Sequence, residues 1–363
     1  MKTCNVRSWY CIAFLAVMSA HKRPPCAPIY VAAPTRSPCA QGYMAPTRRP
    51  CLPVYVTAPT RKPRPPTPQW SFAKLFENYY GSKRVIDGPF RLMDGTMVEV
   101  ADTPVYWSEN STYLMRELVT DQVIITSMNL KFPPSLDVRY IDSRSWEPDH
   151  DSLDFTSYTT TMIEQMFVYG AVEINSNARA DVLSIGLGTG YINSYLHKNY
   201  PRMNITVVEI DPVMLEISKK WFGLVLDNRQ RVLIEDGVQF VRRMAAEKRG
   251  KVYDVIHLDA CTMDESAQVN CPIDIFMTPE IARDFAELLG TTGILVINVM
   301  TLKADHIAAA KLVKRAFQKF FYKCDGKYAP FAPPNIVMTC AKTHKPVGLK
   351  ERYQEWKGYR TGD

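Results

Sequence analysis

The chain has 363 residues, which is enough for two domains or for one large α/β domain with an appendage, and its 46% hydrophobic and 22% charged residues exclude a chain that is disordered throughout. No apolar run approaches the roughly 18–20 residues of a membrane-spanning helix, so a multi-pass membrane protein is excluded and no membrane span is expected. The formal net charge of +7 comes from residues 1–76, which hold 11 lysines and arginines and no acidic residue. The rest of the chain is mildly acidic, so no nucleic acid is expected as a partner.

Residues 1–20 have the pattern of a secretory signal peptide. Lys2 and Arg7 precede the continuous apolar run Cys11–Ala20, which ends in small residues and is followed by a basic stretch. The basic, acid-free composition also suits a mitochondrial transit peptide, and an uncleaved anchor is a further alternative. We therefore predict a protein that is secreted or resides in the lumen of the secretory pathway, with the mitochondrion as the alternative location.

Residues 21–69 form a linker rich in proline, arginine and cysteine. Three copies of a motif of 12–13 residues begin at Pro25, Pro38 and Pro50, and 13 of the 26 prolines lie in the first 69 residues. Proline fixes φ and lacks an amide donor, so we predict a disordered or extended basic tether. The alternative is an interaction tail that binds an acidic partner or cross-links chains.

The cysteines do not have the spacing of a metal site. Two of the nine lie in the predicted signal peptide and three in the repeat, and the four in the folded part are Cys261, Cys271, Cys324 and Cys340. No pair shows a CxxC or Cys/His spacing typical of zinc, so no metal is expected. Removal of a signal peptide leaves seven cysteines, which in an oxidising compartment implies one free thiol or an intermolecular bridge.

Residues 70–150 predict a small β-rich subdomain. The segment Phe90–Val100 is centred on an Asp94-Gly95 turn, a strong hairpin signal, and Val123–Ser127 is another β-branched run. We expect short antiparallel strands throughout this region.

Residues 151–345 alternate strands and helices, which predicts an α/β fold with a doubly wound, Rossmann-like parallel sheet. The predicted strands are Asp181–Ile185, Ile205–Val208, Val232–Glu235, Tyr253–Leu258, Ile294–Met300 and Asn335–Lys342. The predicted helices are Tyr158–Tyr169, Tyr191–Asn199, one that starts near Pro212, Val238–Lys248, Pro279–Leu289 and Ala304–Phe320. The first of these could edge a substrate entrance, and residues 346–363 are expected to be a C-terminal tail.

Four successive strands end in a glycine loop or a carboxylate. The loop is 186–190, and the carboxylates are Glu209, Asp236 and Asp259. Ligands of such sheets bind outside the carboxyl ends of the strands. A carboxylate at Glu209 can accept hydrogen bonds from both hydroxyls of a ribose, and Asp236 is placed to bind an adenine amino group. The pattern therefore predicts a cofactor that contains adenosine.

The spacing of the glycines selects among such cofactors. Dinucleotide folds use Gly-x-Gly-x-x-Gly, whereas this loop reads Gly-x-Gly-x-Gly. When the dinucleotide motif is counted from Gly188, Asn193 stands where its third glycine would be. Together with Glu-x-Asp-Pro at Glu209–Pro212, this spacing favours S-adenosylmethionine over NAD. The alternative is a fold that has lost its cofactor.

These stretches resemble the spermidine synthase-like superfamily, and most closely the C-terminal half of the methyltransferase-like proteins that modify translation elongation factor 1-alpha. The resemblance spans about residues 155–342 and rests on Val182–Gly190, Val208–Glu216, Trp221–Gly223, Asp236-Gly237, Tyr253–Asp259 and Cys271-Pro272. It implies a class I methyltransferase fold with a seven-stranded sheet and an antiparallel last hairpin. We therefore predict that S-adenosylmethionine is bound by Gly186, Gly188, Gly190, Glu209, Ile210, Asp236 and Gly237.

Two departures from polyamine synthases bear on the reaction. Those enzymes have an acidic residue where Thr189 stands, and their Asp-x-x-Asp pair becomes Asp259-Ala-Cys-Thr262 here, with Asp264 close behind. Polyamine synthesis is therefore disfavoured. We predict Asp259 as the catalytic residue, which orients or deprotonates an amine or hydroxyl nucleophile. The alternative is that Asp259 only contacts the methionine end of the cofactor.

The leading hypothesis is an S-adenosylmethionine-dependent methyltransferase that acts on a protein or a small nucleophile. Its alternatives are an aminopropyltransferase and a secreted, non-catalytic relative that serves as a scaffold. Cytosolic synthesis of the cofactor conflicts with a secretory location. The oligomeric state is left open, with a homodimer as one candidate.

Overall fold

The computed structural model describes residues 69–108, 111–121, 123–133, 141–154, 157–247, 253–303, 305–329, 335–343 and 347–361. All of them belong to the second of two compact units, Pro63–Asp363; the first unit is Met1–Lys62. The predicted signal peptide and the proline-rich linker, apart from Gln69, lie outside the described residues.

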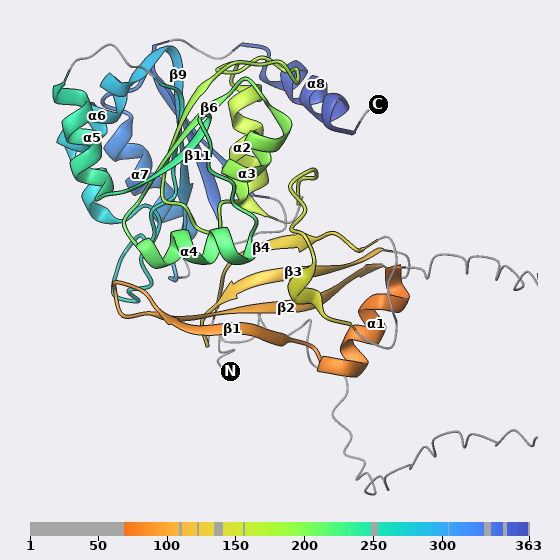
Figure 1. The fold of residues 1–363 in the computed structure, drawn as a ribbon. Helices are drawn as coiled ribbons and strands as arrows, with labels where there is room; N and C mark the ends of the chain where they lie inside the picture. The colour runs from red at the N-terminus through yellow and green to blue at the C-terminus, as the bar shows by residue number, and fades with distance from the viewer. Residues whose placement is uncertain are drawn as a thin grey trace, which may run out of the picture. The chain divides into compact units, whose positions relative to one another are not determined.

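Two β-sheets organise the described residues (Figure 1). Sheet A is antiparallel, in the order β1 (Arg84–Arg91), β2 (Met97–Ser108), β3 (Ser111–Val119), β4 (Ile124–Leu130). Sheet B has the order β10 (Lys323–Tyr328), β11 (Ile336–Ala341), β9 (Leu289–Val299), β8 (Tyr253–Leu258), β5 (Asp181–Ile185), β6 (Asn204–Glu209), β7 (Gln230–Ile234). The helices are α1 (Gln69–Tyr80), α2 (Tyr158–Val168), α3 (Tyr191–Asn199), α4 (Pro212–Trp221), α5 (Gly237–Ala246), α6 (Pro279–Leu288), α7 (His306–Phe317) and α8 (Leu349–Thr361), with 3-10 turns η1 (Ser143–Ser145) and η2 (Asp274–Met277).

Sheet B confirms the predicted α/β class and the seven strands. Strands β9, β8, β5, β6 and β7 run parallel, whereas β11 and β10 are antiparallel at one edge. Helices cover both faces (Figure 1). One core cluster holds side chains of α2, α3, α4 and α8, and the other holds those of α5, α6 and α7. Burial on both faces explains why the central strands read as apolar runs.

Sheet A confirms the predicted β subdomain and its hairpin. The turn between β1 and β2 contains Gly95 at φ +90°, and the Asp94 carboxylate accepts a hydrogen bond from the Thr96 N–H at 2.9 Å. The prediction of strands from residue 70 onward is wrong at its start, because Gln69–Tyr80 is helix α1. Phe76 and Tyr80, one turn apart, pack their rings 5.0 Å from each other, and this apolar face covers the core of sheet A.

The C-terminal segment predicted as a tail contains helix α8. Its Trp356 is buried and stacks on Phe167 of α2, with ring centroids 4.2 Å apart. Arg352 donates hydrogen bonds to the Phe167 carbonyl at 2.9 and 2.8 Å. Long-range packing therefore stabilises a helix whose own sequence is mostly polar.

Buried polar contacts join sheet A to helix α4. The guanidinium of Arg116 on β3 makes a bidentate ion pair with Asp102 on β2, at 2.8 and 3.0 Å. It also donates to the carbonyls of Ser143 at 2.6 Å and of Trp221, at the end of α4, at 3.0 Å. Arg116 and Asp102 are both fully buried, so one arginine ties sheet A to η1 and, through the Trp221 carbonyl, to helix α4, which packs on sheet B.

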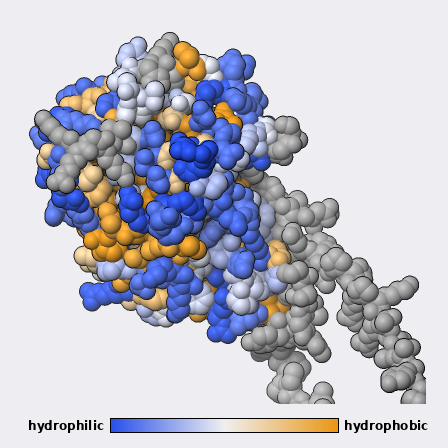
Figure 2. All heavy atoms as spheres, turned by 45° about the horizontal axis from the view of Figure 1, so that its top comes forward, coloured by the Kyte–Doolittle hydropathy of each residue, from blue (hydrophilic) through white to orange (hydrophobic). Residues whose placement is uncertain are grey.

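The surface of the described residues carries both hydrophilic and apolar side chains. On the face drawn in Figure 2, hydrophilic side chains cover most of the area and apolar side chains gather in one part of it. Within the described ranges, none of the helices combines the length and the apolar content needed to cross a membrane.

Replacement of Arg116 by methionine is expected to lower the free energy of unfolding by about 3–5 kcal/mol, because Asp102 would keep a buried charge without its partner. Urea denaturation measures this loss from the shift of the midpoint at an unchanged slope. The matched control is Arg243→Met, whose ion pair with Glu235 is half-exposed and contributes at most about 1 kcal/mol. Equal losses in the two variants would contradict the proposed role of Arg116.

Candidate active site

The carboxyl ends of five parallel strands lie along one edge of sheet B. Strand β5 pairs in register with β6 and β8, and β8 pairs with β9, so residues at or just after these strand ends are neighbours. This edge brings together Gly186, Glu209, Asp236, Asp259 and Asn298. The first four were predicted from the sequence as site residues.

The glycine loop follows β5 and lies directly against the end of β8. Gly186 has φ +95°, and a Cβ at this position would be 2.4 Å from the carbonyl oxygen of Asp259, so no side chain fits. Gly188, at φ +55°, faces open space, since a Cβ there would meet no atom within 4 Å. Gly190 begins helix α3 at φ +79°. The loop therefore presents bare backbone beside an open region and a helix N-terminus, as a bound cofactor requires.

Glu209, the last residue of β6, points toward the glycine loop. Its Oε2 accepts a hydrogen bond from the Leu187 N–H at 2.8 Å, and its Oε1 accepts one from the Asp211 N–H at 2.9 Å. Burial raises the pKa of this carboxyl, and the backbone N–H groups oppose that shift. A carboxylate has about four acceptor sites, so the backbone donors leave acceptor capacity for a hydroxyl group.

Ile210 and Asp236 flank this carboxylate. The Ile210 side chain follows Glu209 directly and is 55% exposed, an apolar surface on which an adenine ring could lie. Asp236 caps helix α5, because its Oδ1 accepts hydrogen bonds from the N–H groups of Val238 at 2.7 Å and Gln239 at 3.2 Å. Its second oxygen, Oδ2, supplies further acceptor capacity for an adenine amino group.

Gly237, also predicted to bind the cofactor, is buried between the sheet and a helix. A Cβ there would be 2.8 Å from Cγ2 of Ile185 and 3.1 Å from the ring of Phe276. The close approach of α5 to β5 accounts for this glycine.

Asp259 is held by two neutral donors. The Tyr158 hydroxyl at the start of α2 donates to Oδ2 at 2.8 Å, and the Asn298 amide on β9 donates to Oδ1 at 2.7 Å. The Asn298 Oδ1 in turn accepts from the Asn335 amide at 2.8 Å. Burial raises the pKa of the Asp259 carboxyl, and the two hydrogen bonds act in the opposite direction.

Sequence reasoning missed the role of Asn298 and gave Tyr158 only a place at a possible substrate entrance. A signal existed for Asn298, since it is the one polar side chain in the apolar run Ile294–Val299 and is fully buried. Tyr158 stays protonated, because burial and the Asp259 carboxylate raise the pKa of its hydroxyl well above the usual value. Both side chains orient the predicted catalytic carboxylate.

Asp264 does not form a carboxylate pair with Asp259. It is exposed, and its Oδ1 accepts a hydrogen bond from the Ser266 N–H at 2.8 Å within the same loop. Hydrogen bonds from Ser266 lower the pKa of its carboxyl. Asp259 is therefore left without a second carboxylate from this loop.

A cleft of about 910 Å³ lies between sheet A and the loop that follows β8. Its acidic lining residues are Glu99, Asp121 and Glu265, and its apolar ones include Met97 and Met263. None of the predicted cofactor residues lines it. The cleft thus reaches the loop that follows Asp259, and no residue of the glycine loop lines it.

The glycine loop, Glu209 and Asp236 fit an adenosyl cofactor. The fit rests on the open space above Gly188, on the unused acceptor sites of the two carboxylates and on the exposed Ile210 side chain. A protein side chain does not fill the position above Gly188 among the described residues.

Several curated proteins are similar in sequence to this chain. The "eEF1A lysine and N-terminal methyltransferase homolog" of Drosophila melanogaster is 38% identical over 177 residues, which are 49% of this chain and 25% of that protein. The human "eEF1A lysine and N-terminal methyltransferase" is 31% identical over 137 residues, or 36% of this chain and 20% of that protein. This chain thus spans about a fifth to a quarter of the length of these relatives.

Solved structures share the fold. Human methyltransferase-like protein 13 in complex with SAH aligns with a TM-score of 0.51 at 23% identity, over 56% of this chain and 92% of that chain. A probable spermidine synthase from Corynebacterium glutamicum aligns with a TM-score of 0.53 at 17% identity, over 74% and 86%.

A match to a family model confirms the family that the motifs predict. Residues 162–344 match the family model described as the spermine/spermidine synthase domain, and this range holds every predicted cofactor residue and Asp259. The match covers half of the chain and includes all of sheet B. The protein belongs to the spermine/spermidine synthase domain family.

Proposed function

We propose that this protein is an S-adenosylmethionine-dependent methyltransferase that modifies an amine of a protein. The observation that carries the proposal is the position of Glu209, whose buried carboxylate faces a glycine loop that touches the end of β8 at Asp259. Glu209 and Asp259 lie at the carboxyl ends of β6 and β8, on either side of β5, which supports a nucleoside-binding role for the first and a proton-accepting role for the second. The names of the relatives support transfer of a methyl group.

The residues at the edge of the sheet would divide the binding of the cofactor. Glu209 would accept hydrogen bonds from the ribose hydroxyls, Ile210 would pack on the adenine, and Asp236 would accept from its amino group. The backbone of Gly186 and Gly188 leaves room for the methionine end. The bound cofactor supplies an electrophilic methyl group on a sulfonium.

Asp259 would act on the acceptor. Its oxygens are held by Tyr158 and Asn298, and burial raises the pKa of its carboxyl, which brings it closer to the pKa of a useful general base. The carboxylate would take the proton of the attacking amine and align its lone pair with the methyl group. Proximity and alignment supply most of the rate of such a transfer, so a single acid–base group is sufficient.

The acceptor follows from the lone carboxylate and from the relatives. A polycationic polyamine needs several carboxylates, and Asp264, the nearest candidate in sequence, is turned into its own loop. The relatives are named for lysine and N-terminal methylation of eEF1A, so the amines of eEF1A are the first acceptors to test. Aminopropyl transfer and a non-catalytic scaffold are the competing functions. Labelled methyl transfer to eEF1A distinguishes all three, with putrescine and decarboxylated S-adenosylmethionine as the parallel assay.

The signal peptide, the secretory location and the homodimer stay predictions. The segment predicted to be a signal peptide lies outside the described residues. The relatives named above support neither a secreted protein nor a dimer.

Replacement of Glu209 by glutamine is expected to weaken S-adenosylmethionine binding by about tenfold to a hundredfold, because hydrogen bonds to a charged acceptor contribute about 1.5–3 kcal/mol each. Glutamine keeps the shape and one oxygen, so the glycine loop should persist. Calorimetric titration measures the change. The control is Glu216→Gln on α4, an exposed glutamate whose loss should leave the affinity unchanged. Absence of binding by the unaltered protein would favour the scaffold.

The affinity for S-adenosylmethionine is expected to fall in acid as Glu209 becomes protonated. Burial raises the pKa of this carboxyl above the usual 4.5, so the charged acceptor is present above the raised pKa and is lost as the pH drops through it. Calorimetry over a pH series, within the range where circular dichroism is constant, measures the midpoint. Glu209→Gln should remove this dependence, and a midpoint below 4.5 would contradict the assignment.

Replacement of Asp259 by asparagine is expected to lower kcat by about 10²–10⁴-fold while the affinity for S-adenosylmethionine stays nearly constant. Asparagine preserves size but cannot take up a proton. Methylation of eEF1A with labelled cofactor gives kcat, and calorimetry gives the affinity. An equal loss in both quantities would show instead that Asp259 contacts the methionine end of the cofactor. Asp264→Asn is the control, and its kcat should be unchanged.

A further inference from the structure

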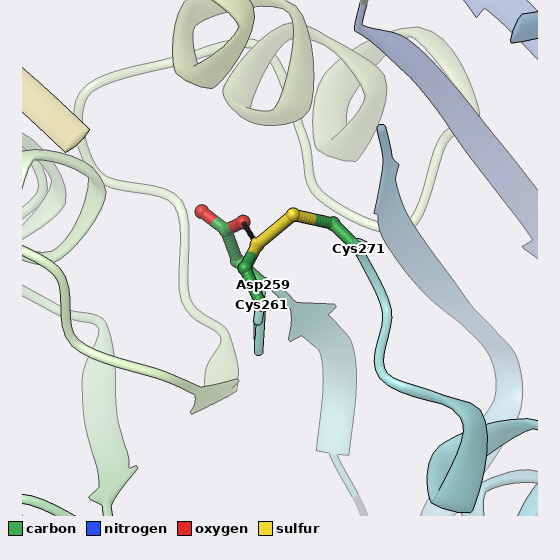
Figure 3. A group of neighbouring side chains, drawn as sticks. All are labelled: Asp259, Cys261 and Cys271. Carbon is green, nitrogen blue, oxygen red and sulfur yellow. Dashed lines mark hydrogen bonds between the residues drawn. A yellow bond between two sulfur atoms is a disulfide. The ribbon is translucent and has the colours of Figure 1, made fainter. Parts of the chain in front are cut away.

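A disulfide lies directly beside the Asp259 carboxylate. It joins Cys261, two residues after Asp259, to Cys271 at the far end of the same loop (Figure 3). Cys261 is exposed and its Sγ lies 3.5 Å from Oδ1 of Asp259. The carboxylate oxygen and the two sulfurs all lie within 4.8 Å of one another.

The loop between the two cysteines is held by many hydrogen bonds besides the disulfide. The Thr262 N–H donates to the Asn270 carbonyl at 2.9 Å, and the Asn270 amide donates to the carbonyls of Thr262 and Asp264 at 3.1 and 2.9 Å. Cys271 and Met300 exchange backbone hydrogen bonds of 3.0 and 2.9 Å. These contacts would keep the cysteines adjacent to each other, and to Asp259, after reduction.

The three side chains form a suitable donor set for a thiophilic divalent cation. Zinc binds thiolate sulfur at about 2.3 Å and carboxylate oxygen at about 2.0 Å, so a tetrahedral ion holds such a sulfur and oxygen about 3.5 Å apart. The distance between Cys261 Sγ and Asp259 Oδ1 already has this value. Separation of the two sulfurs on reduction would open the centre of the set to the ion, with water as the fourth ligand.

We propose that Cys261, Cys271 and Asp259 form a redox-controlled binding site for Zn²⁺ or a similar thiophilic cation. A dithiol reductant donates two electrons and two protons; the S–S bond breaks, two thiols form, and the reductant becomes a disulfide. Binding of the cation then displaces the two thiol protons. In the oxidised protein Cys261 and Cys271 are joined, so neither offers a thiolate and the ion does not bind between them.

The second disulfide provides an internal comparison. Cys324 and Cys340 face each other on β10 and β11 and are both fully buried. Among the described residues, the set of Asp259, Cys261 and Cys271 is the one group of three potential ligands, so the second pair lacks a third ligand. A reductant in solution should reach the exposed Cys261 first.

The effect of the site on catalysis rests on the proposed function, whereas cation binding does not. A bound Zn²⁺ would take a lone pair of the carboxylate that is proposed to accept the proton of the amine. Reduced protein with Zn²⁺ should therefore lose methyl transfer and keep its affinity for S-adenosylmethionine. Loss of cofactor binding in the oxidised protein would contradict the proposed function and leave the cation site intact.

The test compares Zn²⁺ binding by the full chain before and after reduction with a phosphine, which is converted to its oxide by water. Competition with a chromophoric chelator gives stoichiometry and affinity, and Co²⁺ in place of Zn²⁺ reports thiolate ligands by a charge-transfer absorption. The variants are the double replacement Cys261→Ser with Cys271→Ser, the single replacement Asp259→Asn, and the control pair Cys324→Ser with Cys340→Ser. All of them retain the five N-terminal cysteines, which set a common background.

The reduced unaltered protein should bind one more Zn²⁺ than the reduced Cys261/Cys271 variant, which shares its other cysteines. Asp259→Asn should weaken that additional site by at least about tenfold, the loss that even an outer-shell change produces. The control pair should keep the site; if that variant does not fold, the reduced Asp259→Asn protein, which retains all nine cysteines, serves as the reference. Equal stoichiometry in the reduced unaltered protein and the Cys261/Cys271 variant would overturn the proposal.

Discussion

The contact on which the site depends is the one between Gly186 and the end of strand β8. The Gly186 N–H donates to the carbonyl of Val208, and the Asp259 N–H donates to the carbonyl of Ile185, both at 2.9 Å. The end of β5 is thus bonded to both neighbouring strands, and the space for a side chain at Gly186 is taken by the Asp259 carbonyl. The loop that would hold the cofactor and the carboxylate that would serve the acceptor are therefore joined through the same strand end.

The charges around the Asp259 carboxylate differ from those that a bound polycation requires. Its immediate partners, Tyr158 and Asn298, are neutral donors. The carboxylate of Asp264 instead accepts a hydrogen bond from Ser266 within its own loop. Every further carboxylate at this depth would raise the pKa of its neighbours and require a bound cation for stability. A single carboxylate with a raised pKa is better suited to remove one proton from one amine. Glu99 and Glu265 line the separate cleft between sheet A and the loop that follows β8.

The predictability of each element follows from how local its cause is. Strand Asp181–Ile185 and helix Tyr191–Asn199 were predicted with their observed bounds, because a buried apolar run and the flanking glycines mark both. Strand Lys323–Tyr328 has no such pattern; it is a polar edge strand, and only the family resemblance implied it. Helices α1 and α8 depend on distant partners such as Trp146 and Phe167. The same holds in the site: the carboxylates at strand ends could be read from the sequence, whereas the hydrogen bonds of Asn298 and the pairing of Cys261 with Cys271 exist only once separate segments meet.

The redox state of Cys261 and Cys271 connects the chemistry of the site with the compartment of the protein. In an oxidising lumen the disulfide persists, the carboxylate of Asp259 is free of metal, and the supply of S-adenosylmethionine becomes the limiting factor. In a reducing compartment the cofactor is abundant where it is made, and the two thiols stand beside the same carboxylate. The predicted signal peptide and the cytosolic cofactor therefore make opposite demands on the site. Oxidation keeps Asp259 free of the cation, but S-adenosylmethionine is scarce in an oxidising lumen. If the protein passes from one compartment to the other, or if the redox potential around it changes, the state of Cys261 and Cys271 would set its activity.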